Sequence, residues 1–279
     1  MRRHTDVSLR NKYSGGTSAL YLAVQTGSLA MINMLLDAGA DVNVRDAQDW
    51  CPLHKATFME NDQVELCLLS HNAEPNAQNM KGVTSLHLCV TKLEKNADKI
   101  AKCLLQYGAN ANIADKSGTT PFMAAIHNNK LDLMALMLAY NADVSLPDAN
   151  QRPPLYVASM RGSVAMVKIL LNHGADVNQT CKAESDWTPL MIAIKLQHHA
   201  VVDQLLKRGA DVNKQSRQGV IALTLALRSD DMTSAAKLAQ NCSARNIYQV
   251  CGFLGLSLSI KQLLTSYKNE CILLVHISP

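Results

Sequence analysis

The feature that most constrains this chain is an internal repeat of about 33 residues. A large apolar residue recurs at nearly constant spacing, at Leu20, Leu53, Leu86, Phe122, Leu155, Leu190 and Leu223. The steps between these positions are 33, 33, 36, 33, 35 and 33 residues. A unit of this length cannot bury its own apolar face, so it has to stack on its neighbours. The sequence therefore predicts a linear array of similar small units.

Two further markers keep the same phase as the first. An apolar pair such as Leu35-Leu36 or Leu170-Leu171 ends a stretch with apolar residues at i, i+3 and i+4, which is typical of an amphipathic helix. A turn follows each pair and in four repeats contains a glycine where a positive φ ends the helix. These glycines are Gly39, Gly108, Gly174 and Gly209, and Asn72 and Asn141 take their place in two other repeats.

The other half of each unit predicts a first, shorter helix. It begins TSLHLCVT at Thr84, TPFMAAIH at Thr120 and TPLMIAIK at Thr188. A hydroxyl at the first position can cap a helix, and proline is tolerated in the first turn. Alanine follows at the same place in most units, for example at Ala56 and Ala125, and its small side chain lets paired helices approach closely. Each unit is thus expected to be two antiparallel helices and a turn.

These residues resemble the ankyrin repeat family, whose signature is T-P-L-H-x-A on a 33-residue period. The resemblance implies an all-α solenoid of stacked helix-turn-helix units with β-hairpin-like loops. We assign residues 1–15 to an N-terminal segment that resembles the end of a truncated repeat, 16–241 to seven repeats, 242–265 to a degenerate repeat that caps the array, and 266–279 to a tail without a predicted structure. Three extra residues are expected between the helices of repeat three, near residue 94, and two in the loop near Cys181.

The composition and motifs argue against an enzyme. The net charge of +4 is spread along the chain, so no nucleic-acid footprint is visible. None of the eight cysteines forms CxxC or has a histidine at finger spacing, so we expect no zinc site and no cofactor. His54 and His87 occupy the fourth signature position and are predicted to hydrogen-bond the neighbouring turn. We expect His198 and His199 to be solvated and the cysteines to be packing thiols.

The chain also lacks the sequence signals of export and of membrane insertion. Its N-terminus has charge but no apolar stretch of the signal-peptide kind, and no run approaches the roughly 18 apolar residues of a membrane span. We therefore expect an intracellular monomer in the cytoplasm, or alternatively in the nucleus, without membrane insertion. The DVS sequence at Asp6 resembles the end of a repeat, which fits a chain that begins inside a longer array.

The function expected from the resemblance is non-enzymatic protein–protein interaction, since stacked repeats build an extended concave surface for a partner protein. The alternative is a substrate-recognition adaptor of a larger assembly such as a ubiquitin ligase. Residues 242–279 lack the leucine-cysteine-arginine helix and the proline motif that a SOCS box would need. An enzyme or a nucleic-acid binder is the third class, and neither a catalytic cluster nor a basic, aromatic-studded face supports it.

The resemblance also predicts where the partner would bind. Ankyrin proteins contact partners through the residues just before the Thr-Pro start and through the end of the first helix. Both tryptophans of this chain occupy such positions, and tryptophan is enriched at binding hot spots. The predicted partner-binding residues are Trp50, Phe58, Met59 and Met80 in repeats two and three, and Arg152, Met160, Arg161, Trp187 and Lys195 in repeats five and six. Alternatively, each tryptophan packs against neighbouring loops and only stabilises the stack.

One modification is implied by the same resemblance. Ankyrin repeats carry loop asparagines that intracellular dioxygenases can hydroxylate, and the matching positions here are Asn43, Asn76, Asn112, Asn178 and Asn213. The competing interpretation is that these asparagines chiefly hydrogen-bond the backbone of the turn.

Overall fold

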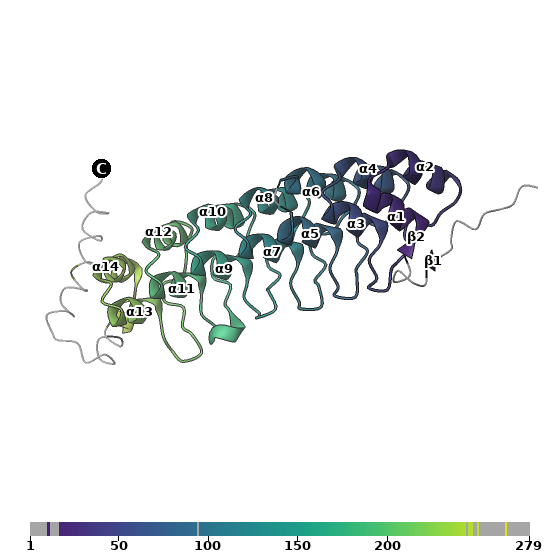
Figure 1. Cartoon of the computed structure of the whole chain (residues 1–279). Coiled ribbons are helices and arrows are strands. Elements are labelled where there is room, and N and C mark those ends of the chain that lie inside the picture. Colours follow the sequence, from purple (N-terminus) through teal and green to yellow (C-terminus); the bar gives the residue numbers. More distant parts are fainter. Residues whose placement is uncertain are drawn as a thin grey trace, which may run out of the picture. The chain divides into compact units, whose positions relative to one another are not determined.

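The computed structural model describes residues 10–11, 17–93, 95–243, 245–247, 250 and 266 of the chain. The chain divides into two compact units, residues 1–149 and 150–279. Both are helical, and each is built from pairs of antiparallel helices joined by short turns (Figure 1). This confirms the predicted all-α ankyrin-repeat architecture.

The first unit holds four helix pairs. Their bounds are α1 (Ala19–Thr26) with α2 (Leu29–Asp37), α3 (Pro52–Phe58) with α4 (Asp62–Ser70), α5 (Ser85–Thr91) with α6 (Ala97–Gln106), and α7 (Pro121–His127) with α8 (Leu131–Ala139). The first helices of these pairs lie side by side in one row, the second helices form another, and the loops project from the side of the first helices (Figure 1). Two short antiparallel strands, β1 (Arg10–Asn11) and β2 (Thr17–Ser18), precede α1 and pair Arg10 with Ser18.

The second unit repeats this arrangement. Its elements are α9 (Pro154–Met160), α10 (Val164–Asn172), the 3₁₀ helix η1 (Lys182–Glu184), α11 (Pro189–Lys195), α12 (His199–Lys207), α13 (Ala222–Arg228) and α14 (Met232–Asn241). The two predicted insertions are found where expected: α5 and α6 are separated by residues 92–96, and η1 occupies the loop after α10. Cys181 and Trp187 form an isolated antiparallel bridge around η1, so this loop is hairpin-like.

Each helix pair forms because local signals and burial agree. The hydroxyl groups of Thr84, Thr120 and Thr188 accept hydrogen bonds from the backbone N–H three residues later and cap their helices. The seven large apolar residues that define the repeat are at most 1% exposed. The small residue three positions after each of them is equally buried, as at Ala56 and Ala125. Close helix packing through small residues therefore builds the core of each repeat.

The predicted ends of the array fall partly outside the described residues. Residues 245–247 and Val250 are helical, and Cys242, Ile247 and Val250 are buried. The rest of the predicted degenerate repeat, the tail apart from Ser266, and residues 1–9 and 12–16 lie outside the described part of the chain. No helix in the described part is long and apolar enough to cross a membrane.

Candidate functional site

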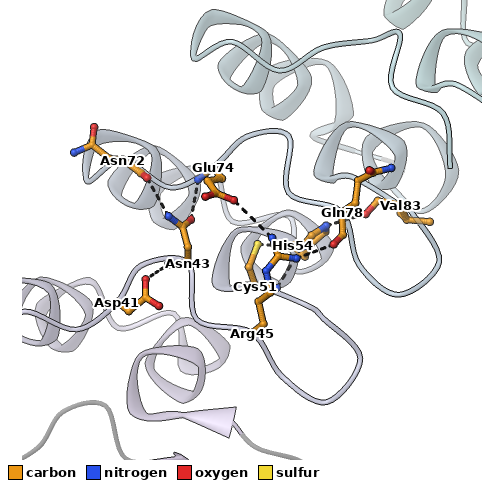
Figure 2. Close-up of polar contacts among 9 residues, drawn as sticks. All are labelled: Asp41, Asn43, Arg45, Cys51, His54, Asn72, Glu74, Gln78 and Val83. Atoms are coloured by element: carbon orange, nitrogen blue, oxygen red, sulfur yellow. Dashed lines mark hydrogen bonds and ion pairs between the residues drawn. The ribbon is translucent and has the colours of Figure 1, made fainter.

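The hairpin asparagines link successive turns of the stack. The side-chain amide of Asn43 donates to the Asn72 carbonyl at 3.4 Å, and its oxygen accepts from the backbone N–H of Glu74 at 2.8 Å (Figure 2). Asn76 and Asn112 each bridge the following turn in the same way. In the second unit Asn178 and Asn213 accept backbone hydrogen bonds from Asp211 and Ser243. All five asparagines therefore have the structural role that the competing interpretation proposed, and their hydroxylation stays a prediction.

The signature histidines also bind the next turn, as predicted. His54 Nε2 donates to the Val83 carbonyl at 2.9 Å (Figure 2), and His87 Nε2 donates to the Thr119 carbonyl at 3.0 Å. A carbonyl partner requires a proton on Nε2, so Nδ1 accepts from the backbone N–H three residues earlier in both cases. Burial lowers the pKa of both imidazoles, which keeps them neutral. These histidines are scaffold rather than catalytic bases.

His198 is only partly exposed, so the solvated position predicted for it is found in part. Its Nε2 lies 3.1 Å from the Met160 carbonyl, and the ring packs over Gly162 so closely that a Cβ there would lie 2.8 Å from it. The glycine before α10 therefore makes room for the imidazole. His199 is exposed, and its ring lies 3.5 Å from the buried carboxylate of Asp231. The sequence pattern could not reveal that His198 faces the neighbouring repeat.

The first predicted surface is organised around Trp50, which is half-buried. Its backbone N–H donates to the Asp46 carboxylate at 2.9 Å. Its indole lies 5.9 Å from the Phe58 ring in an edge-to-face arrangement and 5.7 Å from the His54 ring. A shallow pocket of about 240 Å³ is lined by Tyr21, Asp46, Gln48, Trp50, Lys55 and Phe58. Trp50 thus contacts the scaffold and, together with Phe58, also lines an accessible depression.

The methionines predicted with Trp50 are exposed but do not line this pocket. Met59 immediately follows α3 and is 44% exposed, and Met80 lies on the next hairpin and is 49% exposed. The backbone N–H of Met80 donates to the Gln48 carbonyl, which holds the two hairpins together. Phe58 is 48% exposed. We call Trp50, Phe58, Met59 and Met80 the Trp50 surface, a set of apolar residues on the first helix of repeat two and on the hairpins that precede α3 and α5.

Tyr21 is a pocket residue that sequence reasoning missed. Burial, and then the nearby Asp46 carboxylate, raises the pKa of its phenol to about 12. The tyrosine is therefore neutral, and its ring forms a wall of the pocket that contains Trp50. Its position directly after Leu20 was available from the repeat alignment, but the pattern does not say on which side of the helix an aromatic ring will emerge.

Residues of the second predicted surface line another pocket. Trp187 and Met160 pack against a buried cluster of Tyr156, Cys181 and Ile192. The Lys195 ammonium lies over the indole of Trp187, 5.1 Å from its centroid, a cation–π contact. We call the cavity the Trp187 pocket; it measures about 280 Å³ and is lined by Tyr156, Met160, Ala183, Glu184, Ser185, Trp187, Ile192, Lys195 and Gln218. Three of the five residues predicted here therefore meet at one site.

The two predicted arginines do not line this pocket. Arg152 is half-buried two residues before α9, and Arg161 is exposed immediately after it. Glu184, Ser185 and Gln218 line the pocket but were not predicted. The sequence signal that could have found the first two is the two-residue insertion near Cys181.

The described residues hold neither a metal cluster nor an activated nucleophile that sequence analysis overlooked. No group of three or more His, Cys, Asp or Glu side chains in the described ranges could hold a metal ion. Burial raises the pKa of the Cys89 thiol well above its ordinary value, and the partly buried Cys67 thiol donates to Asn33. These thiols pack or hydrogen-bond, which agrees with the prediction made for them.

Glu65 is an unexpected carboxyl in the core. It lies in α4 and is fully buried; the equivalent residues of the other repeats are Ile32, Ala101, Met134, Val167, Val202 and Ala235, all apolar and buried. Its Oε2 accepts a hydrogen bond from Thr57 at 3.2 Å, whereas Oε1 has no partner among the described residues. Burial, and to a smaller degree the neighbouring Asp62, raises the pKa of Glu65 to about 8. The carboxyl is therefore protonated at neutral pH.

Comparison with known proteins identifies the family. The family model for ankyrin repeats in three copies matches residues 1–79 and 86–181, and the model for the single ankyrin repeat matches 185–217. The chain belongs to the ankyrin repeat family, a family of protein–protein interaction modules. Nothing in the comparisons or in the described residues points to catalysis.

Individual relatives share the repeats and not the whole protein. Human SH3 and multiple ankyrin repeat domains protein 2 is 32% identical over 123 residues, 44% of this chain and 6% of that protein. Human ankyrin repeat and SOCS box protein 3 is 32% identical over 112 residues, 39% of this chain and 21% of that protein. The crystal structure of the ankyrin repeat domain of Bcl-3, a member of the IkappaB protein family, is 25% identical with a TM-score of 0.68, covering 76% of this chain and 95% of that one.

Proposed function

We propose that this chain binds a partner protein through the side formed by its first helices and hairpins, which is the concave side of an ankyrin stack. The observation that supports this most is that each tryptophan lies at the hairpin and first-helix side of its own unit, half-buried, and lines a depression beside exposed apolar or cationic side chains. Tryptophan contributes strongly to binding hot spots because it buries a large rigid area. Exposed apolar surface gathered in one place is unusual unless it is used.

The Trp50 surface supports this proposal by its composition. Phe58, Met59 and Met80 are each more than two-fifths exposed, and Phe58 packs edge-to-face against the half-buried Trp50 ring. The Lys55 ammonium lies 5.8 Å from the centroid of the Phe58 ring, so the apolar area has a charged margin. An apolar centre with a polar rim is the usual organisation of a protein interface.

The decisive test compares exposed apolar residues on the two sides of the helix pairs. The full chain and its variants are expressed with an affinity tag in cells, and captured proteins are quantified by mass spectrometry. We expect Trp50→Ala or Trp187→Ala to lose partners that the unchanged chain captures. The matched controls are Met34→Ala on α2 and Leu66→Ala on α4, which are exposed apolar residues of the second helices.

A melting curve for each variant separates binding from stability. If Trp50→Ala and Trp187→Ala melt early while capture per folded molecule is unchanged, the tryptophans belong to the scaffold. Loss of capture in the Met34→Ala or Leu66→Ala controls, with capture intact in the tryptophan variants, would move the binding site to the second helices.

An adaptor role in a ubiquitin ligase is the second candidate. It is supported by the likeness to ankyrin repeat and SOCS box protein 3, a likeness that covers 21% of that protein. The same capture experiment tests it, because ubiquitin-ligase subunits should then be recovered with the chain independently of Trp50 and Trp187.

Fluorescence microscopy of the tagged chain tests the intracellular location, which stays a prediction.

Hydroxylation of the hairpin asparagines is a separate proposal. The amide oxygens of Asn43 and Asn76 accept backbone hydrogen bonds of the next turn, so an enzyme would reach them after the hairpin opens. Peptide mass analysis of protein from cells should then find additions of one oxygen atom at these residues. Unmodified peptides at every one of the five positions would remove the proposal.

A further inference from the structure

The loop that carries Trp187 is longer than its counterparts. From Gly174 to the helix-capping Thr188 the chain advances 14 residues, whereas it advances 12 from Gly209 to Ile221. The longer loop contains η1, and backbone hydrogen bonds close it. The Cys181 N–H donates to the Trp187 carbonyl at 2.8 Å, and the Trp187 N–H donates to the Glu184 carbonyl at 3.1 Å. The insertion is therefore an ordered turn that ends at the indole.

The following hairpin holds this turn in place. The backbone N–H of Arg217 donates to the Ser185 carbonyl at 2.8 Å, and its guanidinium pairs with the Asp186 carboxylate at 3.2 Å. The Gln218 amide also donates to the Ser185 hydroxyl at 3.2 Å. Ser185 and Asp186 both have positive φ, at 55° and 62°, a backbone geometry that non-glycine residues adopt at a cost unless their surroundings support it. The wall of the Trp187 pocket is thus prearranged, which lowers the entropy lost on binding.

The size and lining of the pocket fit one side chain. Its volume of about 280 Å³ lies at the lower limit of small-molecule pockets, roughly 300–1,000 Å³. Met160, Trp187 and Ile192 supply an apolar interior, while Glu184, Ser185, Lys195 and Gln218 supply polar groups. A single large apolar side chain fits such a space and leaves the polar groups for its neighbours in the peptide.

The chain carries several cations at this pocket and next to its lining residues in the sequence. Lys195 lines it, and the exposed Lys182 and Arg161 adjoin the lining residues Ala183 and Met160 in the chain. Glu184 is the carboxylate of the lining; Asp186 does not line the pocket and pairs with Arg217. A partner segment with carboxylates beside its anchor would therefore meet complementary charge, which favours association and sets register.

We propose that the Trp187 pocket binds a large apolar side chain of an acidic peptide segment, with Asp or Glu residues on either side of that anchor. The inference rests on the proposed partner-binding function and specifies the chemistry of the partner at this one site. The inserted turn creates the specificity, since it contributes Ala183, Glu184 and Ser185 to the lining.

The test selects peptides on the full chain and then removes the features of the pocket. A phage library of random twelve-residue peptides is selected on the unchanged chain, and enriched peptides are synthesised and titrated by fluorescence anisotropy. We expect enrichment of one Phe, Leu or Trp bracketed by Asp and Glu. Lys195→Glu should weaken these peptides about tenfold, because it replaces attraction by repulsion. Deleting Ala183 and Glu184, which restores the ordinary loop length, should abolish their binding.

The matched control is Lys207→Glu, the same charge change at the end of α12. It should leave affinity within about twofold, since Lys207 is exposed on a second helix and does not line the pocket, and interactions between exposed charges are screened by salt. Basic or uncharged peptides, peptides whose binding survives both pocket variants, or the absence of any enrichment would each overturn the proposal. The proposed function would still stand in those cases if cellular partners depend on Trp50 or Trp187 but are retained by Lys195→Glu and by the two-residue deletion.

Discussion

Replacing Glu65 by methionine should stabilise the chain, and more strongly as the pH rises. The carboxyl is fully buried, and one of its oxygens has no hydrogen-bond partner among the described residues. Met134 occupies the same register in repeat four and is equally buried, so the core of a repeat accepts this side chain. The substitution removes an ionisable group while it keeps the length of the side chain.

The magnitude follows from the pKa of Glu65. Burial raises that pKa from 4.5 to about 8, so the folded chain keeps a proton that the unfolded chain releases. Each unit of difference corresponds to about 1.4 kcal/mol. The free energy of unfolding of the unchanged protein therefore falls as pH rises from about 4.5 to about 8, and by pH 7 this carboxyl has cost roughly 3 kcal/mol. Loss of the Thr57 hydrogen bond offsets about 1 kcal/mol of the gain.

Urea unfolding of the unchanged protein and of Glu65→Met, followed by circular dichroism between pH 5.5 and 8.5, measures the effect. The stability difference should grow by about 1.4 kcal/mol for each pH unit up to about pH 8 and then level off. Other ionisable groups cancel in the difference because both proteins contain them. Glu65→Gln is the control for charge alone: it should show the same pH dependence with a smaller absolute gain, since its buried amide needs partners.

A stability difference that stays flat over this pH range would refute the reasoning. Glu65 would then be ionised in the folded chain, and the raised pKa would be wrong. A loss of stability in Glu65→Met at every pH, with Glu65→Gln unchanged, would instead mean that the Thr57 hydrogen bond outweighs the cost of the buried carboxyl.

Three further expectations concern the scaffold. Gly82→Ala should destabilise the chain by about 2 kcal/mol more than Gly39→Ala. Both glycines have positive φ, but only at Gly82 would the new Cβ lie 2.7 Å from a backbone nitrogen, so equal urea midpoints for the two variants would contradict this. Burial lowers the pKa of His87 below its ordinary 6.5, so the unfolded chain takes up a proton at a higher pH than the folded chain does. Stability should therefore fall as the pH drops below about 6.5, and a His87→Gln variant with the same acid dependence would argue against this role of His87. Deleting residues 242–279 should lower the melting temperature, because burial of the Ile247 side chain alone contributes about 2 kcal/mol to stability. An unchanged melting curve would reject the predicted cap.

Most of the fold could be predicted because its signals are local and repeated. Thr84 caps a helix and His87 binds the next turn, and both roles depend on a few neighbouring residues. The positive φ expected at Asn72 and Asn141 is found for the same reason, at 63° and 62°. Where a unit of the array has the same pattern of residues as its neighbours, the structure of one unit predicts that of the others.

The departures from the repeat were harder to interpret. The inserted loop was located correctly, but its contacts with Arg217 and Gln218, which turn it into the wall of a pocket, lie 31 and 33 residues away from Asp186 and Ser185. Glu65 interrupts the apolar pattern of its helix, although sequence alone cannot distinguish a buried carboxyl from one that reaches solvent. The role of His198 was missed because the ring rests on a glycine of the preceding repeat.

The hydrogen bonds between neighbouring turns have a consequence for how such a chain can evolve. Asn43 and Asn76 form hydrogen bonds with backbone groups of the following repeat, and so do His54 and His87. Backbone groups are the same whatever side chains the neighbour carries, so these contacts would form equally well with a duplicated repeat. Gene duplication can therefore lengthen or shorten the array without redesigning its junctions, while the surface residues of each copy stay free to diverge toward new partners.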